Sequence, residues 1–187
     1  SNDFHSGMNF AGVLKTPSVF FCKNNQWAIS THVSSQTSSQ GIAVKAQAYG
    51  FDGVLVDGND VLAVYLATKT AMKNARDGRG PTLIEALTYR LSSHSTSDDG
   101  SRYQDQVEYK KWLNKDPIAR FRKYLNNAGI WTVEYEQELQ EKFDRQISDA
   151  IAQVESSPMP SVDTLITDVY SEIPNALRSD FEDIRNV

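Results

Sequence analysis

The sequence predicts an α/β domain, built on a parallel β-sheet with helices on both faces and followed by an all-helical segment. Up to about Tyr89, short apolar runs alternate with amphipathic stretches. Apolar strands between helices are typical of parallel sheets that are covered on both faces. From Asp105 onward no strand-like run remains, and helical patterns take over. We therefore expect one domain in residues 1–104 and a helical segment in residues 105–187.

The first predicted elements are a helix and a strand. Apolar residues recur at helical spacing in Asp3–Leu14, and Asp3 suits the N-cap of this helix. Pro17 ends the helix, because proline removes a backbone donor and clashes with the preceding turn. Ser18–Cys22 is a short apolar run and predicts a strand. Thr31–Gln40 is rich in Ser, Thr and Gln, which predicts a loop.

Helix and strand then alternate twice more. We expect a short helix in Gly41–Tyr49 and the next strand in Gly53–Val56. Val61–Arg76 has its apolar residues along one face, which predicts a helix, and Asp60 before it is a good N-cap. The last predicted strand is Thr82–Thr88.

The helical segment is expected to hold five helices. Asp116 followed by Pro117 is typical of a helix start, because proline fits the first turn. Gly129 is typical of a helix stop. The longest helix carries an apolar stripe at three- and four-residue spacing, which indicates packing on a domain or subunit. The predicted helices are Gln106–Leu113, Pro117–Asn126, Val133–Ser156, Ser161–Tyr170 and Ala176–Arg185.

Composition excludes several functional classes. The 187 residues carry a net charge of −5 and no basic stripe, so we expect no nucleic-acid partner. No apolar run approaches membrane-spanning length, so we expect no membrane association. The single cysteine, Cys22, leaves no internal disulfide possible.

Two adjacent asparagines, Asn24 and Asn25, stop the first strand abruptly. Open α/β sheets bind ligands at the carboxyl edge of their strands. A hard cation such as magnesium takes oxygen ligands and often shares them with a phosphate. The pair therefore offers half of a metal–diphosphate site. A simple turn at the strand end is the alternative, because asparagine readily bonds to its own backbone.

A long polar loop, Arg90–Tyr103, follows the last predicted strand. Long loops in compact domains are usually functional or disordered. This one places His94 between Arg90 and Arg102, a combination suited to diphosphate binding and proton transfer. A solvated loop is the alternative. Because both loops leave the carboxyl ends of predicted parallel strands, they are expected to meet at one edge of the sheet.

Several stretches match one enzyme family in order along nearly the whole chain. They are Asn9–Ala11, Phe20–Ser30, Val56–Asp60, Val64–Tyr65, Ile84–Arg90, His94–Asp99, Asp116–Ile118 and Thr167–Tyr170. Together they resemble the alpha subunit of the thiamine-diphosphate-dependent 2-oxo acid dehydrogenases, most of all the branched-chain (2-oxoisovalerate) type. The resemblance implies that residues 1–104 are the later part of the thiamine-diphosphate-binding domain. It implies that residues 105–187 pack on that domain and on partner subunits.

The resemblance implies a magnesium site at the asparagine pair. Asn25 would bind the ion through its side chain and Trp27 through its backbone carbonyl. The family usually has tyrosine at the second position, which a carbonyl ligand tolerates. The family motif begins with Gly-Asp-Gly or Gly-Glu-Gly, and its acidic ligand is expected just before Ser1. We therefore expect the isolated chain to bind the cofactor poorly and to be inactive.

The resemblance also implies residues that bind thiamine diphosphate. Lys23 stands where the family often has arginine, so it would keep the charge on the diphosphate but lose the bidentate fork. Ile29 and Arg90 would lie at the cofactor. His94 would be the catalytic residue, assisting proton transfer beside the diphosphate. The adjacent pair Asp98–Asp99 is expected to order the loop through arginine or backbone contacts.

The implied activity is oxidative decarboxylation of a branched-chain 2-oxo acid, with thiamine diphosphate and magnesium, and transfer of the acyl group to a lipoyl carrier. The implied partners are a beta subunit, in a heterotetramer of two alpha and two beta chains, and the lipoyl-bearing acyltransferase. The location would be cytoplasmic in a bacterium and the mitochondrial matrix in a eukaryote. A pyruvate or acetoin type on the same scaffold, and a non-catalytic interaction fragment, are the alternatives.

Overall fold

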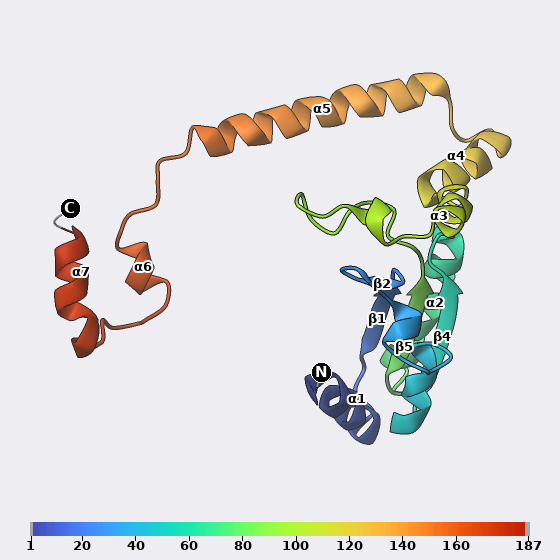
Figure 1. The fold of residues 1–187 in the computed structure, drawn as a ribbon, viewed down its shortest axis with the longest axis horizontal. Helices are drawn as coiled ribbons and strands as arrows, with labels where there is room; N and C mark the ends of the chain where they lie inside the picture. The colour runs from blue at the N-terminus through green and yellow to red at the C-terminus, as the bar shows by residue number, and fades with distance from the viewer. Residues whose placement is uncertain (1, 186–187) are drawn as a thin grey trace. The chain divides into compact units, whose positions relative to one another are not determined.

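The computed structural model describes residues 2–185, and the chain divides into two compact units between Trp131 and Thr132 (Figure 1). The first unit contains the sheet and both loops, and the second is helical. The boundary predicted between residues 104 and 105 is of another kind, because it marks the end of a cofactor-binding domain. It stays a prediction. Within residues 2–185, no helix combines the length and the apolar character that crossing a membrane requires.

Three parallel strands form the central sheet of the first unit, as predicted, in the order β1-β5-β4. They are β1 (Val19–Asn24), β4 (Asp52–Asp57) and β5 (Thr82–Leu87). Asn24 and Asp57 each lie opposite Leu87, so the last residues of the strands are level. The carboxyl ends of the strands therefore reach the same edge of the sheet.

The helix α2 (Val61–Arg76) connects β4 to β5 and spans the predicted residues. The side-chain Oδ1 of Asp60 caps it by accepting hydrogen bonds from two backbone N–H groups of the first turn, both at 3.1 Å. Gly58 lets the preceding turn approach the sheet closely. A Cβ atom there would lie 2.8 Å from the carbonyl oxygen of Leu87.

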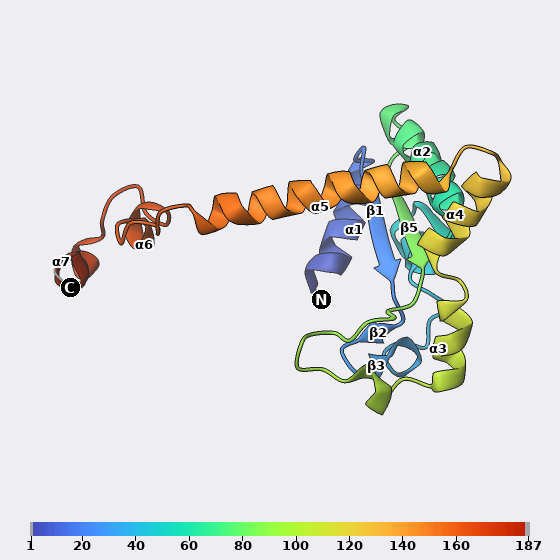
Figure 2. The ribbon, with the colours of Figure 1, turned by 90° about the horizontal axis from the view of Figure 1, so that it is seen from above.

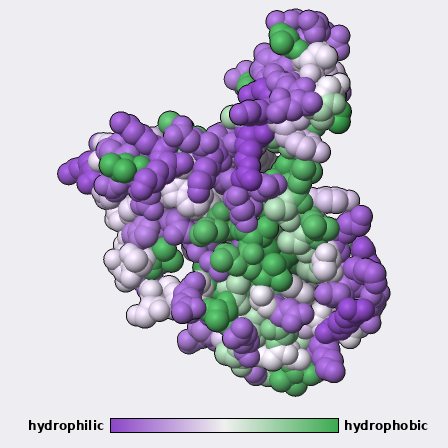
Figure 3. Space-filling model, turned by 90° about the vertical axis from the view of Figure 1, so that its right-hand side faces the viewer, coloured by the Kyte–Doolittle hydropathy of each residue, from purple (hydrophilic) through white to green (hydrophobic). Residues whose placement is uncertain are grey.

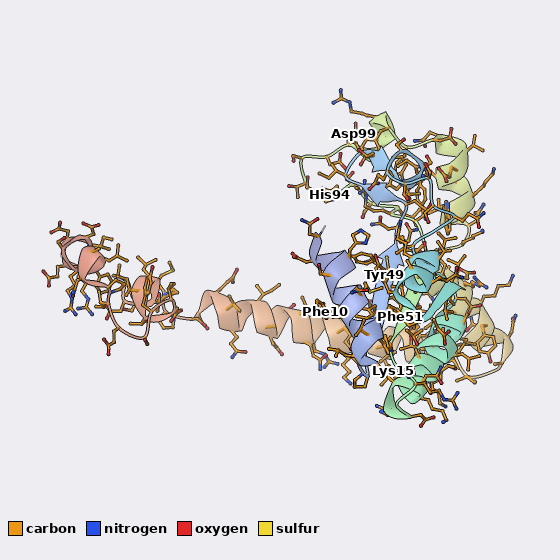
Figure 4. All side chains as sticks on the ribbon, turned by 90° about the horizontal axis from the view of Figure 1, so that it is seen from below. Phe10, Lys15, Tyr49, Phe51, His94 and Asp99 are labelled. Carbon is orange, nitrogen blue, oxygen red and sulfur yellow. The ribbon has the colours of Figure 1, made fainter. Side chains whose placement is uncertain are left out.

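The other face of β5 packs on two helical elements. They are α1 (Asn2–Leu14) and the 3-10 helix η2 (Ala43–Tyr49). Met8 of α1, Ala46 of η2 and Leu83 of β5 form the buried core. Because side chains alternate along a strand, the neighbouring Thr82 faces the opposite side, where it borders α2. Figure 4 shows Tyr49 beside α1, and its ring stacks on that of Phe51.

Helices cover both faces fully only at the central strand. The first five residues of β5, Thr82–Ala86, are buried, whereas Phe21 of β1 is 49% exposed and Leu55 of β4 is 59% exposed. Exposed apolar residues continue onto α2, where Leu66 is 63% exposed. Figure 3 shows apolar residues gathered on one face of the molecule. The prediction of a sheet with helices on both faces is therefore confirmed for β5 and only in part for the outer strands.

A small hairpin follows β1. Its strands are β2 (Trp27–Ala28) and β3 (Thr31–His32), and the short 3-10 helix η1 (Val33–Ser35) comes next. The prediction of a loop over Thr31–Gln40 is therefore wrong at its start. The pairing of Trp27 with His32 across the hairpin gives the first two residues of that stretch a strand conformation.

Two helices follow the long loop in the first unit, where a short 3-10 turn, η3 (Gly100–Arg102), comes first. They are α3 (Gln106–Leu113) and α4 (Pro117–Asn127), close to their predicted bounds. Asp105 and Asp116 cap them through side-chain oxygens. Arg120 of α4 donates to Asp57 (2.7 Å) and to Asp60 (2.9 Å). These ion pairs tie α4 to the turn between β4 and α2.

The second unit is helical. Its elements are α5 (Val133–Glu155), α6 (Thr164–Thr167), η4 (Asn175–Leu177) and α7 (Arg178–Arg185). Arg185 donates to Asp163 at 2.6 Å and so connects α7 to the start of α6. In α5 the predicted apolar stripe is exposed, with Phe143 at 49% and Ile147 at 58%. The packing of this stripe on a domain or subunit stays a prediction.

Two predicted helices of this unit are shorter than expected. Ser161–Tyr170 contains only the single turn α6, and the helix predicted from Ala176 begins at Arg178, after η4. The hydroxyl oxygen of Ser161 accepts a hydrogen bond from the N–H of Asp163. The hydroxyl of Thr164 donates one to the backbone carbonyl of Ser161. Such local side-chain bonds compete with the helical pattern and favour turns.

Candidate functional site

The turn after β1 is built by the asparagine pair. The side-chain oxygen of Asn24 accepts a hydrogen bond from the N–H of Gln26, and that of Asn25 accepts one from Trp27, both at 3.1 Å. The backbone of Gln26 has a positive φ of 70°, which the two bonds help to hold. The pair therefore forms the strand-end turn that was the alternative to a binding site, and this turn presents Asn25 at the edge of the sheet.

The hairpin beyond this turn reverses at Ile29. Its φ is +52°, a conformation that β-branched residues rarely adopt, and its side chain is 56% exposed. The carbonyl oxygen of Ile29 accepts a 2.6 Å hydrogen bond from Nη2 of Arg90. The long loop thus holds the hairpin in this strained conformation.

Arg90 joins the two loops, as predicted from their position at the ends of parallel strands. Its backbone N–H donates to the carbonyl of Asn25 (3.1 Å), and its Nη2 donates both to Ile29 and to the hydroxyl of Tyr103 (2.6 Å). Its Nε donates to the carbonyl of Ser92 at 3.2 Å. Figure 2 shows the hairpin and the loop after β5 together at one end of the sheet.

Asp98 orders the long loop from within. Its Oδ2 accepts hydrogen bonds from the hydroxyl of Tyr103 (2.6 Å) and from the backbone N–H of His94 (2.7 Å). These bonds, the first more than the second, lower the pKa of Asp98, and the bond to Asp98 raises the pKa of Tyr103. Asp99 accepts from Ser101 and caps η3. The prediction that this acidic pair orders the loop is confirmed.

Among the residues that the structure describes, the side chains of His94, on the long loop, and Lys23, on β1, make no hydrogen bond to those that join the two loops. The side chain of His94 is exposed, and Figure 4 shows it on the long loop with Asp99. Lys23 is exposed on β1, two residues before Asn25. Among residues 2–185, no hydrogen bond or ion pair joins either side chain to Arg90 or to the turn. Their roles at a cofactor stay predictions.

An aromatic cluster packs beneath the hairpin. The ring of Trp27 lies 4.9 Å from that of His32, 5.2 Å from Tyr103 and 6.2 Å from Tyr89, measured between centroids. Burial raises the pKa of Tyr89, although the nearby Trp27 lowers it. Within the described residues, Trp27 Nε1, His32 Nε2 and the Tyr89 hydroxyl have no hydrogen-bond partner. Buried polar atoms of this kind are commonly satisfied by ordered water.

Glu85 also belongs to this site, although the sequence did not predict a role for it. It lies in the middle of β5 and is 1% exposed. Its Oε1 accepts from the side-chain Nδ2 of Asn24, and its Oε2 accepts from the backbone N–H groups of Ile42 and Ala43, all at 2.7 Å. Its role could have been inferred from a single acidic residue inside an otherwise apolar strand, because a buried carboxylate requires hydrogen-bond partners.

A hollow of about 330 Å³ opens at the same edge of the sheet. Its walls come from the asparagine turn, η1, the segment before η2 and the ends of β4 and β5. They include Asn24, Gln26, Thr37, Gly41, Leu55 and Glu85. The sheet is therefore concave beside the asparagine turn, where open α/β sheets bind ligands, and the wall includes Asn24 but not Asn25.

The residues at this edge fit part of a site for a hard cation and a phosphate. Asn25 offers a side-chain amide oxygen and Trp27 a backbone carbonyl, and magnesium prefers such oxygen ligands. The Asn25 oxygen accepts one hydrogen bond, from Trp27, and retains a second lone pair. Within residues 2–185, no three His, Cys, Asp or Glu side chains group as a metal site.

Comparison with known proteins places the chain in a family. Residues 1–163 match the family described as dehydrogenase E1 component. The chain is 46% identical to the 3-methyl-2-oxobutanoate dehydrogenase subunit alpha of Mycobacterium tuberculosis, over 98% of this chain and 50% of that protein. It is 45% identical to the human mitochondrial 2-oxoisovalerate dehydrogenase subunit alpha, over 97% of this chain and 41% of that protein.

A relative with a different name is almost as similar. The pyruvate dehydrogenase E1 component subunit alpha of Bacillus cereus is 43% identical, over 96% of this chain and 49% of that protein. The chain thus spans about half the length, or less, of the curated relatives that it matches. The family match covers most of the chain and the identities are high along it. The chain therefore belongs to the dehydrogenase E1 component family.

Proposed function

We propose that this chain is part of the alpha subunit of a decarboxylating 2-oxo acid dehydrogenase component that acts on a branched-chain 2-oxo acid. The names of the Mycobacterium tuberculosis and human relatives support this substrate class. The single observation that carries the proposal is the bonding of Arg90 to the carbonyls of Asn25 and Ile29. It joins the turn proposed to hold the cation to the loop proposed to hold the diphosphate.

The chain's own residues have distinct roles in this proposal. The side-chain oxygen of Asn25 and the carbonyl of Trp27 would hold magnesium. Lys23 and Arg90 would balance the charge of the diphosphate, and Ile29 would lie against the cofactor. Thiamine diphosphate, when bound, supplies the electron sink for loss of the substrate carboxylate.

His94 is proposed to hold or move a proton at the reacting centre. An imidazole can act as a general acid or as a general base. The exposed position of His94 on the loop leaves its side chain open to a ligand at the sheet edge. Asp98 fixes the backbone of His94 and so sets where the imidazole can reach.

The proposed partners follow from the same family. A beta subunit would complete a heterotetramer of two alpha and two beta chains, and a lipoyl-bearing acyltransferase would accept the acyl group. The location would be the mitochondrial matrix in a eukaryote and the cytoplasm in a bacterium. The human relative's name describes that protein as mitochondrial.

Turnover by the assembled enzyme tests the proposal. The complete alpha chain, assembled with its beta chain, is assayed with thiamine diphosphate, magnesium and 3-methyl-2-oxobutanoate. We expect release of carbon dioxide, and we expect Asn25→Ala to abolish most of it at limiting magnesium. If the assembly decarboxylates no 2-oxo acid, the enzymatic proposal fails and a non-catalytic interaction role takes its place.

A pyruvate or acetoin type on the same scaffold is the second candidate. The 43% identity to the Bacillus cereus pyruvate dehydrogenase subunit favours it almost as much as the branched-chain relatives favour the first. Comparing kcat/KM for 3-methyl-2-oxobutanoate, pyruvate and acetoin in the same assembly decides between them. The branched-chain proposal predicts the highest value for 3-methyl-2-oxobutanoate.

A further inference from the structure

A buried carboxylate lies directly behind the asparagine turn. Glu85 is 1% exposed and forms no ion pair within the described residues. It is instead satisfied by three N–H donors at 2.7 Å: the side chain of Asn24 and the backbones of Ile42 and Ala43. Burying a charge without a counter-ion is unfavourable and is tolerated only when hydrogen bonds replace water. So costly an arrangement requires an explanation.

The polarity of these bonds fixes the orientation of the Asn24 amide. A carboxylate only accepts hydrogen bonds, so Asn24 must turn its Nδ2 toward Glu85. Its Oδ1 is then left to accept from the N–H of Gln26. The flipped amide would set donor against donor at Gln26 and acceptor against acceptor at Glu85. The observed orientation alone satisfies both ends.

The bond to Gln26 in turn shapes the residues on either side of it. Gln26 has a φ of +70°, and it lies between Asn25 and Trp27, the two residues proposed to hold the cation. We infer that Glu85 is a positioning residue, which acts through Asn24 to hold the Asn25–Trp27 turn in its binding conformation. The inference rests on the proposed function only for the identity of the ligand.

A purely structural role for Glu85 is the competing explanation. Its Oε2 also anchors the start of η2, and Gly41 packs so closely that a Cβ there would lie 2.9 Å from this oxygen. If that were its only role, substitutions would lower stability without changing the turn. The test therefore reads the turn and the stability separately.

The decisive variants exchange donor and acceptor between the two side chains. Glu85→Gln leaves one acceptor oxygen for three donors. With that oxygen on the N–H groups of Ile42 and Ala43, the new amide N–H faces Asn24 and forces the mismatch described above. Asn24→Asp combined with Glu85→Gln restores complementarity, because the new amide donates to the introduced carboxylate, whose second oxygen still accepts from Gln26. The total charge of the pair is the same as in the unmodified protein. Asn24→Ala removes the link but leaves the bonds from Glu85 to η2.

The measurements use the complete alpha chain assembled with its beta chain. Hydrogen–deuterium exchange of the peptide containing Gln26 and Trp27 reports the turn, and thermal unfolding reports stability. Calorimetry with thiamine diphosphate and magnesium reports binding. For Glu85→Gln and for Asn24→Ala we expect faster exchange in this peptide and about 10- to 100-fold weaker binding, as for other residues that support metal ligands. In the double variant we expect both to return toward the unmodified protein.

Unchanged exchange in both Glu85→Gln and Asn24→Ala overturns the inference, whatever their melting temperatures. The same holds if the double variant exchanges as fast as Glu85→Gln. If the unmodified assembly binds no thiamine diphosphate, the proposed function fails. The exchange comparison still decides whether Glu85 positions the turn.

Discussion

The guanidinium Nη2 of Arg90 donates a 2.6 Å hydrogen bond to the carbonyl of Ile29, a residue 61 positions earlier in the chain. This bond crosses from the loop after β5 to the hairpin after β1. It secures a hairpin whose turning residue is β-branched and has a positive φ. One side chain thus makes the two loops at the sheet edge a single structural unit.

Replacing Arg90 with lysine should uncouple this unit. Lysine keeps the charge but cannot donate to Ile29, Tyr103 and Ser92 from one planar group. We expect the free energy of unfolding to fall by about 1–2 kcal/mol, because the bond from the charged guanidinium to the partly buried Tyr103 hydroxyl is lost together with the exposed bond to Ile29. Chemical denaturation measures the loss. Arg102→Lys in the same loop is the matched control, and an equal loss there would show that the fork of Arg90 is not the cause.

The order of the long loop should decrease at low pH. The hydrogen bond from Tyr103, followed by that from the His94 N–H, lowers the pKa of Asp98 in the folded protein. A lowered pKa means that the ionised carboxylate stabilises the ordered loop. This contribution is complete above the unfolded pKa and is lost as the pH falls through the lower folded value.

An NMR titration of the His94 backbone amide measures this transition. We expect its midpoint to lie below the ordinary pKa of an aspartate and to disappear in Asp98→Asn. Asp99→Asn serves as the control, because Asp99 bonds to Ser101 and not to His94. A midpoint that persists in Asp98→Asn would assign the titration to another group.

Cys22 should react slowly with alkylating reagents at neutral pH. Burial raises its pKa, and the negative charge of Glu85 raises it further. The thiolate is the reactive form, so the alkylation rate should rise with pH at a midpoint above that of a free cysteine. In Glu85→Gln the midpoint should move down. An identical pH profile in the two proteins would mean that Glu85 carries no charge near this thiol.

Asp60 should contribute more to stability than its ion pair alone. It caps α2 and also pairs with Arg120. Arg120→Met removes only half-exposed ion pairs and should lower the free energy of unfolding by less than about 1 kcal/mol. Asp60→Ala also removes the cap and should lower it by about 1 kcal/mol more. Because Arg120→Met removes the pairs to both Asp57 and Asp60 and Asp60→Ala leaves the one to Asp57, equal losses would show that the cap contributes no more than the Asp57 pair.

The sequence predicted the framework of this edge because local patterns carry it. Apolar runs and capping residues gave the strands and α2, and parallel strands bring their carboxyl ends together by geometry. The meeting of the two loops at one edge followed from that, although the particular bond between Arg90 and Asn25 was not predicted. The Asp98–Asp99 pair could also be assigned, since its bonds are to residues a few positions away.

The missed features depend on contacts between distant residues. Glu85 accepts hydrogen bonds from Asn24 and Ile42, which are distant in sequence, and the residues of its own strand do not indicate these partners. The strand β3 exists only because Trp27 pairs with His32. In the second unit, local hydroxyl bonds at Ser161 outweigh a helical pattern. The pattern of apolar residues in the sequence reports neither long-range pairing nor local side-chain hydrogen bonds.

The central claim is that Asn25, held by the joined loops, binds a cation that carries a diphosphate. Calorimetric titration of the complete alpha–beta assembly with thiamine diphosphate, with and without magnesium, tests it most directly. We predict magnesium-dependent binding that is lost in Asn25→Ala and retained in Asn127→Ala, a control at the end of α4. Magnesium-dependent binding of equal strength in Asn25→Ala would contradict the claim.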